Sequence, residues 1–208
     1  MISVVRVIKT EKGQYFMKNI KILKNISSSV LYEFQNLYDL KYRGKRPQDR
    51  WTPNLAASLI NKEDIEYLSQ FLPIQPNSIE LFYISNGMVK PHIDRGRKTA
   101  LQIPVEFDCK KSFVYAAKHS DLSFLTPVRG SFTSRKISKV TAPINNPPNW
   151  FYKWDDDLFD KYNLEFPVLQ NVTLPHGGVN YSEIDEVFFT ISYKPDYDEV
   201  CKKFLSWT

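Results

Sequence analysis

The sequence predicts a mainly β domain of the α+β class, in which helices support a barrel or sandwich of strands. Two observations lead to this prediction. Apolar residues follow helical spacing in two segments before residue 77, and short segments of β character follow one another from residue 79 onward. Neither a strand–helix–strand repeat nor a glycine-rich phosphate loop is visible in the sequence, which argues against a parallel nucleotide-binding sheet.

The N-terminal part contains two predicted helices. Residues 3–8 and 14–23 are predicted strands. The serines at 27–29 then offer an N-cap to a helix, because apolar residues follow them at helical spacing. The basic, polar segment 40–53 is predicted to be a loop. Residues 54–72 are predicted to form the second helix, which the following prolines end.

The remainder of the chain reads as short strands joined by turns. Asn86-Gly87 is typical of a tight turn between strands. Residues 145–157 are rich in proline, then aromatic, then acidic, and are predicted to form an ordered loop or lid. A short helix is predicted within residues 197–207. The predicted strands comprise residues 79–84, 99–107, 113–117, 123–125, 136–141, 168–174 and 187–193.

The length of 208 residues suits a single domain. Within it, residues 1–76 are expected to hold the N-terminal strands and supporting helices. Residues 77–195 are expected to form the β core, and residues 196–208 a C-terminal helix or tail. The content of 42% hydrophobic and 25% charged residues is ordinary for a soluble globular protein.

The net charge and the cysteine content limit which binding partners and which cellular compartment are expected for the protein. The net charge of +5 permits a polyanionic partner without requiring one. The densest basic cluster, between Lys41 and Arg50, is interpreted as a solvated loop, with a phosphate-facing patch as the alternative. Cys109 and Cys201 show no paired spacing, which predicts reduced thiols in a cytoplasmic protein. Every apolar run is too short to span a membrane, and the N-terminal one is too short for a signal peptide.

Two of the three histidines lie in a pattern that suits a metal ion. His92 and Asp94 are two residues apart, and on an extended segment such residues project to the same side. His176 follows the predicted strand 168–174, far enough along the chain for several antiparallel strands to return beside the first. Two imidazoles and one carboxylate on one face of a metal are the set expected for non-haem Fe(II) oxygenases. A zinc hydrolase accepts the same ligand types, so they do not decide the metal.

The third histidine offers an alternative. His119 is followed by Asp121, which makes a second His-x-Asp pair after a predicted strand. It lacks the proline that precedes His92, and a surface turn with a hydrogen bond accounts for such a pair. We favour His92, largely on the resemblance described next.

The segments 91–105 (PHIDRGRKTALQIPV) and 167–180 (PVLQNVTLPHGGVN) resemble the 2-oxoglutarate/Fe(II)-dependent oxygenases, with the aspartyl/asparaginyl β-hydroxylase-like proteins as the nearest branch. The resemblance spans about residues 79–194. It implies a double-stranded β-helix (jelly-roll) sandwich with supporting helices on one face. It also implies that His92, Asp94 and His176 are the catalytic iron ligands and that 2-oxoglutarate is the co-substrate.

The resemblance further implies a cation for the far carboxylate of 2-oxoglutarate, usually an arginine about ten residues after the distal histidine. This chain has Asp185 and Glu186 there. Arg97 is our choice of replacement, although it could instead pair with Asp94 or with solvent. Further candidates at the co-substrate are two lysines and two residues able to add hydrogen bonds: Lys98, Lys194, Tyr83 and Gln102.

The leading hypothesis is therefore a 2-oxoglutarate-dependent dioxygenase that hydroxylates a C–H bond of a small molecule, a peptide side chain or a nucleobase. Nucleic acid is supported only weakly, by the basic balance, and no membrane partner is expected. One alternative is a cupin-like metal-binding sandwich without 2-oxoglutarate chemistry, which the missing strand-borne arginine favours. The other is a jelly-roll binding module that has lost catalysis.

Overall fold

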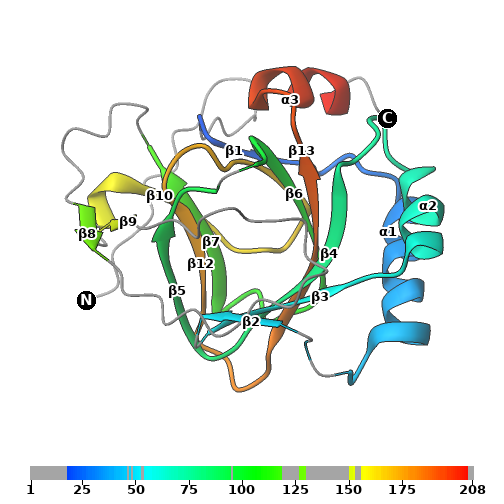
Figure 1. Ribbon diagram of the computed structural model, residues 1–208, viewed down its shortest axis with the longest axis horizontal. Coiled ribbons are helices and arrows are strands. Elements are labelled where there is room, and N and C mark those ends of the chain that lie inside the picture. Colours follow the sequence, from blue (N-terminus) through cyan, green and yellow to red (C-terminus); the bar gives the residue numbers. More distant parts are fainter. Residues whose placement is uncertain are drawn as a thin grey trace.

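Two antiparallel sheets form the body of the protein in a computed structural model that describes residues 18–45, 47, 49–52, 54–94, 96–118, 127–129, 150–152 and 156–205 (Figure 1). The larger sheet has the order β1 (Ile20–Ile22), β11 (Val168–Asn171), β6 (Thr99–Glu106), β13 (Glu186–Tyr193), β4 (Ser78–Ile84), β3 (Leu55–Leu59) and β2 (Asp49–Thr52). The smaller sheet has the order β10 (Phe159–Tyr162), β7 (Ser112–Ala117), β12 (His176–Asn180) and β5 (Gly87–His92). A separate two-stranded antiparallel sheet pairs β8 (Pro127–Arg129) with β9 (Trp150–Tyr152).

The chain passes between the two sheets in jelly-roll fashion. From β4 to β7 each strand lies in the other sheet from the one before it, and the same holds from β10 to β13. All of these pairings are antiparallel. The predicted mainly β, double-stranded β-helix sandwich with N-terminal supporting helices is therefore confirmed.

Three helices cover the outer face of the larger sheet, two of them N-terminal: α1 (Ser28–Leu37), α2 (Lys62–Ser69) and α3 (Tyr197–Leu205). Figure 1 shows α1 and α2 beside β4, outside the sandwich. Ser27 caps α1 by accepting a hydrogen bond from the backbone of Ser29, as the serine run predicted. The ring of Phe34 packs edge-on against Phe189 of β13 at 5.2 Å between centroids, so the helix is fixed by its apolar face.

The central strands are buried on both faces, and their side chains alternate between two cores. Leu81 and Tyr83 of β4 face the helices, whereas Phe82 and Ile84 lie between the sheets. The core between the sheets also includes Phe188 of β13 and residues of the smaller sheet. This alternation decides which side chains reach the interior of the sandwich.

Several strands lie where the sequence predicted them, whereas others, including β5, β10 and β12, were not predicted. The segments predicted at 79–84, 99–107, 113–117 and 187–193 correspond to β4, β6, β7 and β13. The Asn86-Gly87 turn joins β4 to β5, and Gly87 has the positive φ of 135° that favours glycine. Within the predicted lid, residues 150–152 form β9 and residues 156–158 a 3₁₀ turn. The strands predicted at 3–8, 123–125 and 136–141 lie outside the described residues.

Two predictions about the N-terminal part were wrong. Residues 55–59 form β3 and not the start of a helix, because they pair with β4. The helix begins only after Asn61, whose side chain accepts a hydrogen bond from the backbone of Asp64 at 2.7 Å. The segment 40–53 is likewise not simply a loop, since residues 38–42 form a π-helical turn and residues 49–52 form β2.

Three basic residues of the cluster, Lys41, Arg43 and Lys45, make contacts within the chain. Lys41 pairs with Asp64 at 2.5 Å, and Arg43 pairs with Asp39 at 2.8 Å. Lys45 lies over the ring of Tyr42. These contacts agree with the interpretation of the cluster as a solvated surface. No helix in the described part of the chain combines the length and apolarity needed to cross a membrane.

Glu186, the first residue of β13, predicts an unusual dependence of stability on pH. The side chain is fully buried, and among the described residues neither carboxylate oxygen has a hydrogen-bond partner. Burial raises the pKa of Glu186 from 4.5 to about 8. The folded protein therefore keeps a proton that the unfolded chain releases, so this residue costs stability progressively from about pH 4.5 to pH 8.

We expect Glu186→Gln to remove this cost. The free energy of unfolding of the variant should exceed that of the wild type by a difference that grows to a few kcal/mol between these pH values. Urea unfolding at a series of pH values measures it. Glu183→Gln, at an exposed position nearby, is the control that should leave the profile unchanged. Parallel profiles for wild type and Glu186→Gln would show that Glu186 is ionised in the folded protein.

Candidate metal centre

The two sheet strands that carry histidines place them side by side at one end of the smaller sheet. His92 is the last residue of β5 and His176 the first of β12, and the two are direct cross-strand partners. Their ring centroids are 4.6 Å apart. His176 follows the strand predicted at 168–174, but that strand, β11, already stops at Asn171, and His176 opens a new strand in the other sheet.

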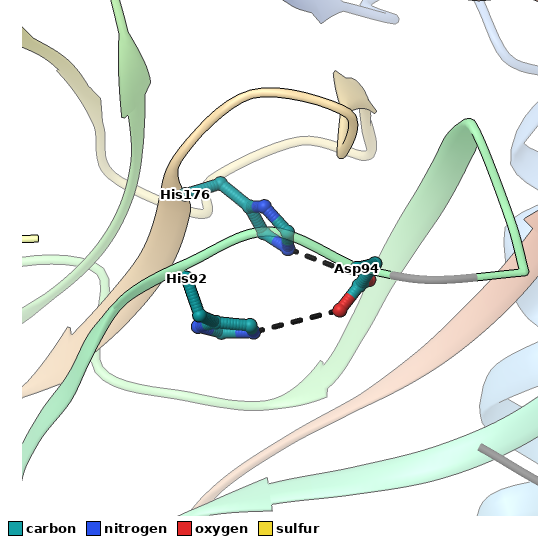
Figure 2. A group of neighbouring side chains, drawn as sticks. All are labelled: His92, Asp94 and His176. Carbon is teal, nitrogen blue, oxygen red and sulfur yellow. Dashed lines mark ion pairs between the residues drawn. The ribbon is translucent and has the colours of Figure 1, made fainter. Parts of the chain in front are cut away.

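Asp94 completes the group from the segment that follows β5. Its carboxylate faces both imidazoles, with Oδ1 3.6 Å from His92 Nε2 and Oδ2 3.5 Å from His176 Nε2 (Figure 2). One ligand atom from each residue lies within 4.8 Å of the others. Bonds of about 2.0–2.2 Å from one ion to nitrogen and oxygen are compatible with such a spacing. Among the described residues, this is the group of histidine, cysteine and acidic side chains that satisfies that spacing.

Backbone contacts fix which nitrogen of each histidine faces the centre. Nδ1 of His92 lies 2.8 Å from the carbonyl oxygen of Lys90, and Nδ1 of His176 lies 2.9 Å from that of Leu174. A carbonyl oxygen only accepts, so each Nδ1 carries the proton and each Nε2 offers a lone pair. Burial, with the neighbouring His176, lowers the pKa of His92 to about 4. His92 is therefore neutral near pH 7, as a metal ligand must be.

Asp94 is ionised in this environment. Burial acts to raise its pKa, but the positive charge of Arg97 beside it holds the pKa well below its usual range. Arg97 donates from Nε to Asp94 Oδ2 at 2.6 Å. It also donates from Nη1 to Ser192 Oγ at 3.0 Å. The group thus provides two imidazole nitrogens and one negative oxygen, which is the donor set of a facial triad.

The residues predicted to bind the co-substrate are only partly brought together. Arg97 lies at the centre, as described. Gln102 lies on β6 between the sheets; its Nε2 donates to Gln170 at 3.1 Å, and its Oε1 has no hydrogen-bond partner among the described residues. Lys98 is half exposed and pairs with Asp196 at 2.9 Å. Lys194 is exposed beyond the end of β13.

The expectation that Tyr83 adds a hydrogen bond at the centre is corrected. Its side chain belongs to the core beneath the helices, on the other face of β4 from Phe82. The Phe82 ring lies 5.5 Å from the guanidinium carbon of Arg97, which places the metal centre on the face that Tyr83 turns away from. Because every second residue of a strand points to the same face, Tyr83 cannot reach the centre.

Sequence reasoning missed three polar residues on the inner face of the larger sheet. Glu80 is cross-strand partner to Thr190, which is in turn partner to Gln102. Burial raises the pKa of Glu80, although the charge of Arg97 opposes the shift. Thr190 Oγ1 is buried without a hydrogen-bond partner among the described residues. Ser192 holds Arg97. The available signal was a polar residue inside an apolar strand, as Glu80 is in SIELFYI.

Comparison with known proteins places the fold. No family model matches the chain, and no curated protein sequence matches it. The crystal structure of the epimerase SnoN in complex with Fe3+, alpha ketoglutarate and nogalamycin RO is similar, with a TM-score of 0.51 and 7% sequence identity over 86% of this chain and 82% of that one. That of HygX from Streptomyces hygroscopicus, with nickel and 2-oxoglutarate bound, has a TM-score of 0.47 and 9% identity over 86% and 84%. The likeness to SnoN shows that this chain has the cupin-like, jelly-roll fold.

Proposed function

We propose that the protein is a non-haem Fe(II) oxygenase that uses 2-oxoglutarate, with His92, Asp94 and His176 as its metal ligands and catalytic residues. The observation that carries the proposal is the convergence of two imidazole nitrogens and one carboxylate from distant parts of the chain. SnoN, which shares the fold, binds iron and alpha ketoglutarate according to its description. That precedent supports the same two cofactors here.

The chemistry that iron and 2-oxoglutarate supply when bound is oxidative decarboxylation to succinate, coupled to attack on a substrate C–H bond. The residues of this chain hold the ion from one side and leave its other positions open for co-substrate and oxygen. The two Nδ1–H···O=C bonds keep both imidazoles in the metal-binding tautomer. We assign hydroxylation as the outcome. The substrate is a small molecule, a peptide side chain or a nucleobase, and the aspartyl/asparaginyl β-hydroxylase-like branch remains our proposal from the two sequence segments.

For the far carboxylate of 2-oxoglutarate, positions in the fold favour Arg97 and Gln102 over Lys98 and Lys194. Arg97 uses one N–H for Asp94 and one for Ser192, so the remaining N–H groups of its guanidinium are able to serve a carboxylate. Gln102 faces the interior beside the unpaired hydroxyl of Thr190. Both lysines are directed to the surface, where an anion is paired only weakly.

A second candidate is a metal-dependent enzyme of the same fold without 2-oxoglutarate chemistry. The observation that favours it is that β13 carries no arginine and begins with the buried, unpaired Glu186. In addition, Arg97 is already bound to Asp94. SnoN is itself described as an epimerase, so this fold accommodates outcomes other than hydroxylation.

Anaerobic titration with Fe(II) and then 2-oxoglutarate tests the proposal. Chelation of iron by the keto acid should produce a weak visible charge-transfer band, and the protein should bind close to one Fe(II) per chain. Succinate, which lacks the keto group, is the matched control and should give no band. Metal binding without the band would favour the second candidate. The absence of metal binding would leave a catalytically inactive jelly-roll module.

A further inference from the structure

We propose that Arg97 is a positioning residue that orients the Asp94 carboxylate for metal binding; this inference rests on the proposed metal centre. Nε of Arg97 donates to Asp94 Oδ2 at 2.6 Å, and Nη1 donates to Ser192 Oγ at 3.0 Å. The guanidinium carbon lies 5.5 Å from the ring centroid of Phe82. Both the Asp94 and the Arg97 side chains are 13% exposed, so solvent screens the pair only weakly.

The Asp94 side chain needs a contact from another side chain to fix its orientation, whereas the two histidines do not. Each histidine lies on a strand, and its Nδ1 bonds to a carbonyl oxygen two residues earlier on the chain. Asp94 lies beyond the end of β5, where its backbone N–H donates to the carbonyl oxygen of Val172 at 3.1 Å. The contact that orients its carboxylate comes from Arg97, which is itself anchored on β13 through Ser192. Arg97 therefore ties the acidic ligand to the larger sheet.

The same contact distinguishes the two oxygens of the Asp94 carboxylate. Oδ2 accepts the hydrogen bond from Arg97 and lies 3.5 Å from His176 Nε2, whereas Oδ1 lies 3.6 Å from His92 Nε2 and accepts no hydrogen bond from Arg97. We therefore expect Oδ1 to be the oxygen that binds the metal, so that Asp94 binds through one atom. A carboxylate that binds through one oxygen leaves an additional coordination position open, which a co-substrate that chelates through two atoms requires.

A purely electrostatic role for Arg97 predicts the opposite behaviour. A guanidinium beside a divalent cation repels it, so removal of the charge alone would tighten metal binding. Loss of the hydrogen bond from Arg97 to Asp94 would instead weaken metal binding by about 10-fold or more, as the loss of outer partners of metal ligands generally does. Arg97→Met and Arg97→Lys separate the two roles. Lysine keeps the charge but lacks the planar fork that reaches Asp94 and Ser192 together.

The experiment titrates the metal-free protein with Co(II) and follows its visible absorption, which reports both the dissociation constant and the coordination number. We expect the dissociation constant to rise about 10-fold or more in Arg97→Met. It should rise by a smaller factor in Arg97→Lys and in Ser192→Ala. The band intensity at saturation should change in Arg97→Met, because the released carboxylate is able to bind through both oxygens. Lys98→Met removes the neighbouring, surface-paired charge and should match the wild type in both readouts.

The outcomes separate this inference from the proposed function. Tighter or unchanged Co(II) binding by Arg97→Met, while the wild type binds, overturns the positioning role and leaves the metal centre intact. An effect confined to the melting temperature of the metal-free variants, with the Co(II) spectrum unaltered, also overturns it. Failure of the wild type to bind Co(II) refutes the metal centre and this inference together.

Discussion

Replacement of His176 by alanine is expected to abolish the metal site while the fold persists. His176 contributes one of the two imidazole nitrogens that face Asp94, and the remaining pair cannot enclose an ion from three sides. The loss of affinity for Fe(II) or Co(II) should exceed the 10- to 100-fold that loss of an outer partner costs. The band that 2-oxoglutarate forms with bound iron should disappear. Equilibrium dialysis and anaerobic spectroscopy measure the two effects.

His119→Ala is the informative partner of that variant. His119 belongs to the other His-x-Asp pair of the sequence and lies outside the described residues. If the metal centre is built from His92, Asp94 and His176, metal binding by His119→Ala should equal that of the wild type. Normal binding by His176→Ala together with lost binding by His119→Ala would reverse the assignment.

Gly177→Ala is expected to be the most disruptive single-methyl change near the centre. A Cβ at Gly177 would overlap the hydroxyl of Tyr115 and lie 2.5 Å from the carbonyl oxygen of Val89. Tyr115 is fully buried and its hydroxyl donates to that same carbonyl. Neither the Tyr115 hydroxyl nor the Val89 carbonyl can therefore move away from the added methyl group. We expect a loss of about 3 kcal/mol in unfolding free energy. Because His176 is the adjacent residue, metal affinity should fall as well.

Gly178→Ala provides the matched control on the same strand. A Cβ there would meet Cδ1 of Ile84 at 2.7 Å, the end of a side chain that can rotate. The cost should therefore be clearly smaller, about 1 kcal/mol. Urea unfolding of the metal-free variants compares the two. Equal stability losses would mean that β12 moves as a unit and that the contact with Tyr115 does not limit it.

Local pattern was sufficient for much of the fold. The alternation in residues 99–107 and the apolar runs at 79–84 and 187–193 identified β6, β4 and β13. The serines before residue 30 marked the start of α1. These features depend on residues within a few positions of one another, so the sequence displays them directly. The spacing of His92 and Asp94, two residues apart, was likewise visible in the local sequence.

Long-range pairing decided what local pattern left open. Residues 55–59 suit either a helix or a strand, and their pairing with β4 made them β3. In β4 both faces carry buried apolar residues, so these residues did not distinguish the face of Tyr83 from that of Phe82, and Glu80 was the one charged residue that marked the inner face. Packing of the helices on one face determined it.

The residue types available to a metal, and the order of helices before strands, could be predicted from the sequence. The pairing of His176 with His92 and the contacts of Arg97 with Asp94 and Ser192 emerge only in the folded chain. Side-chain type and period are local properties of the chain. The meeting of residues some 80 to 100 positions apart depends instead on how two sheets register and pack.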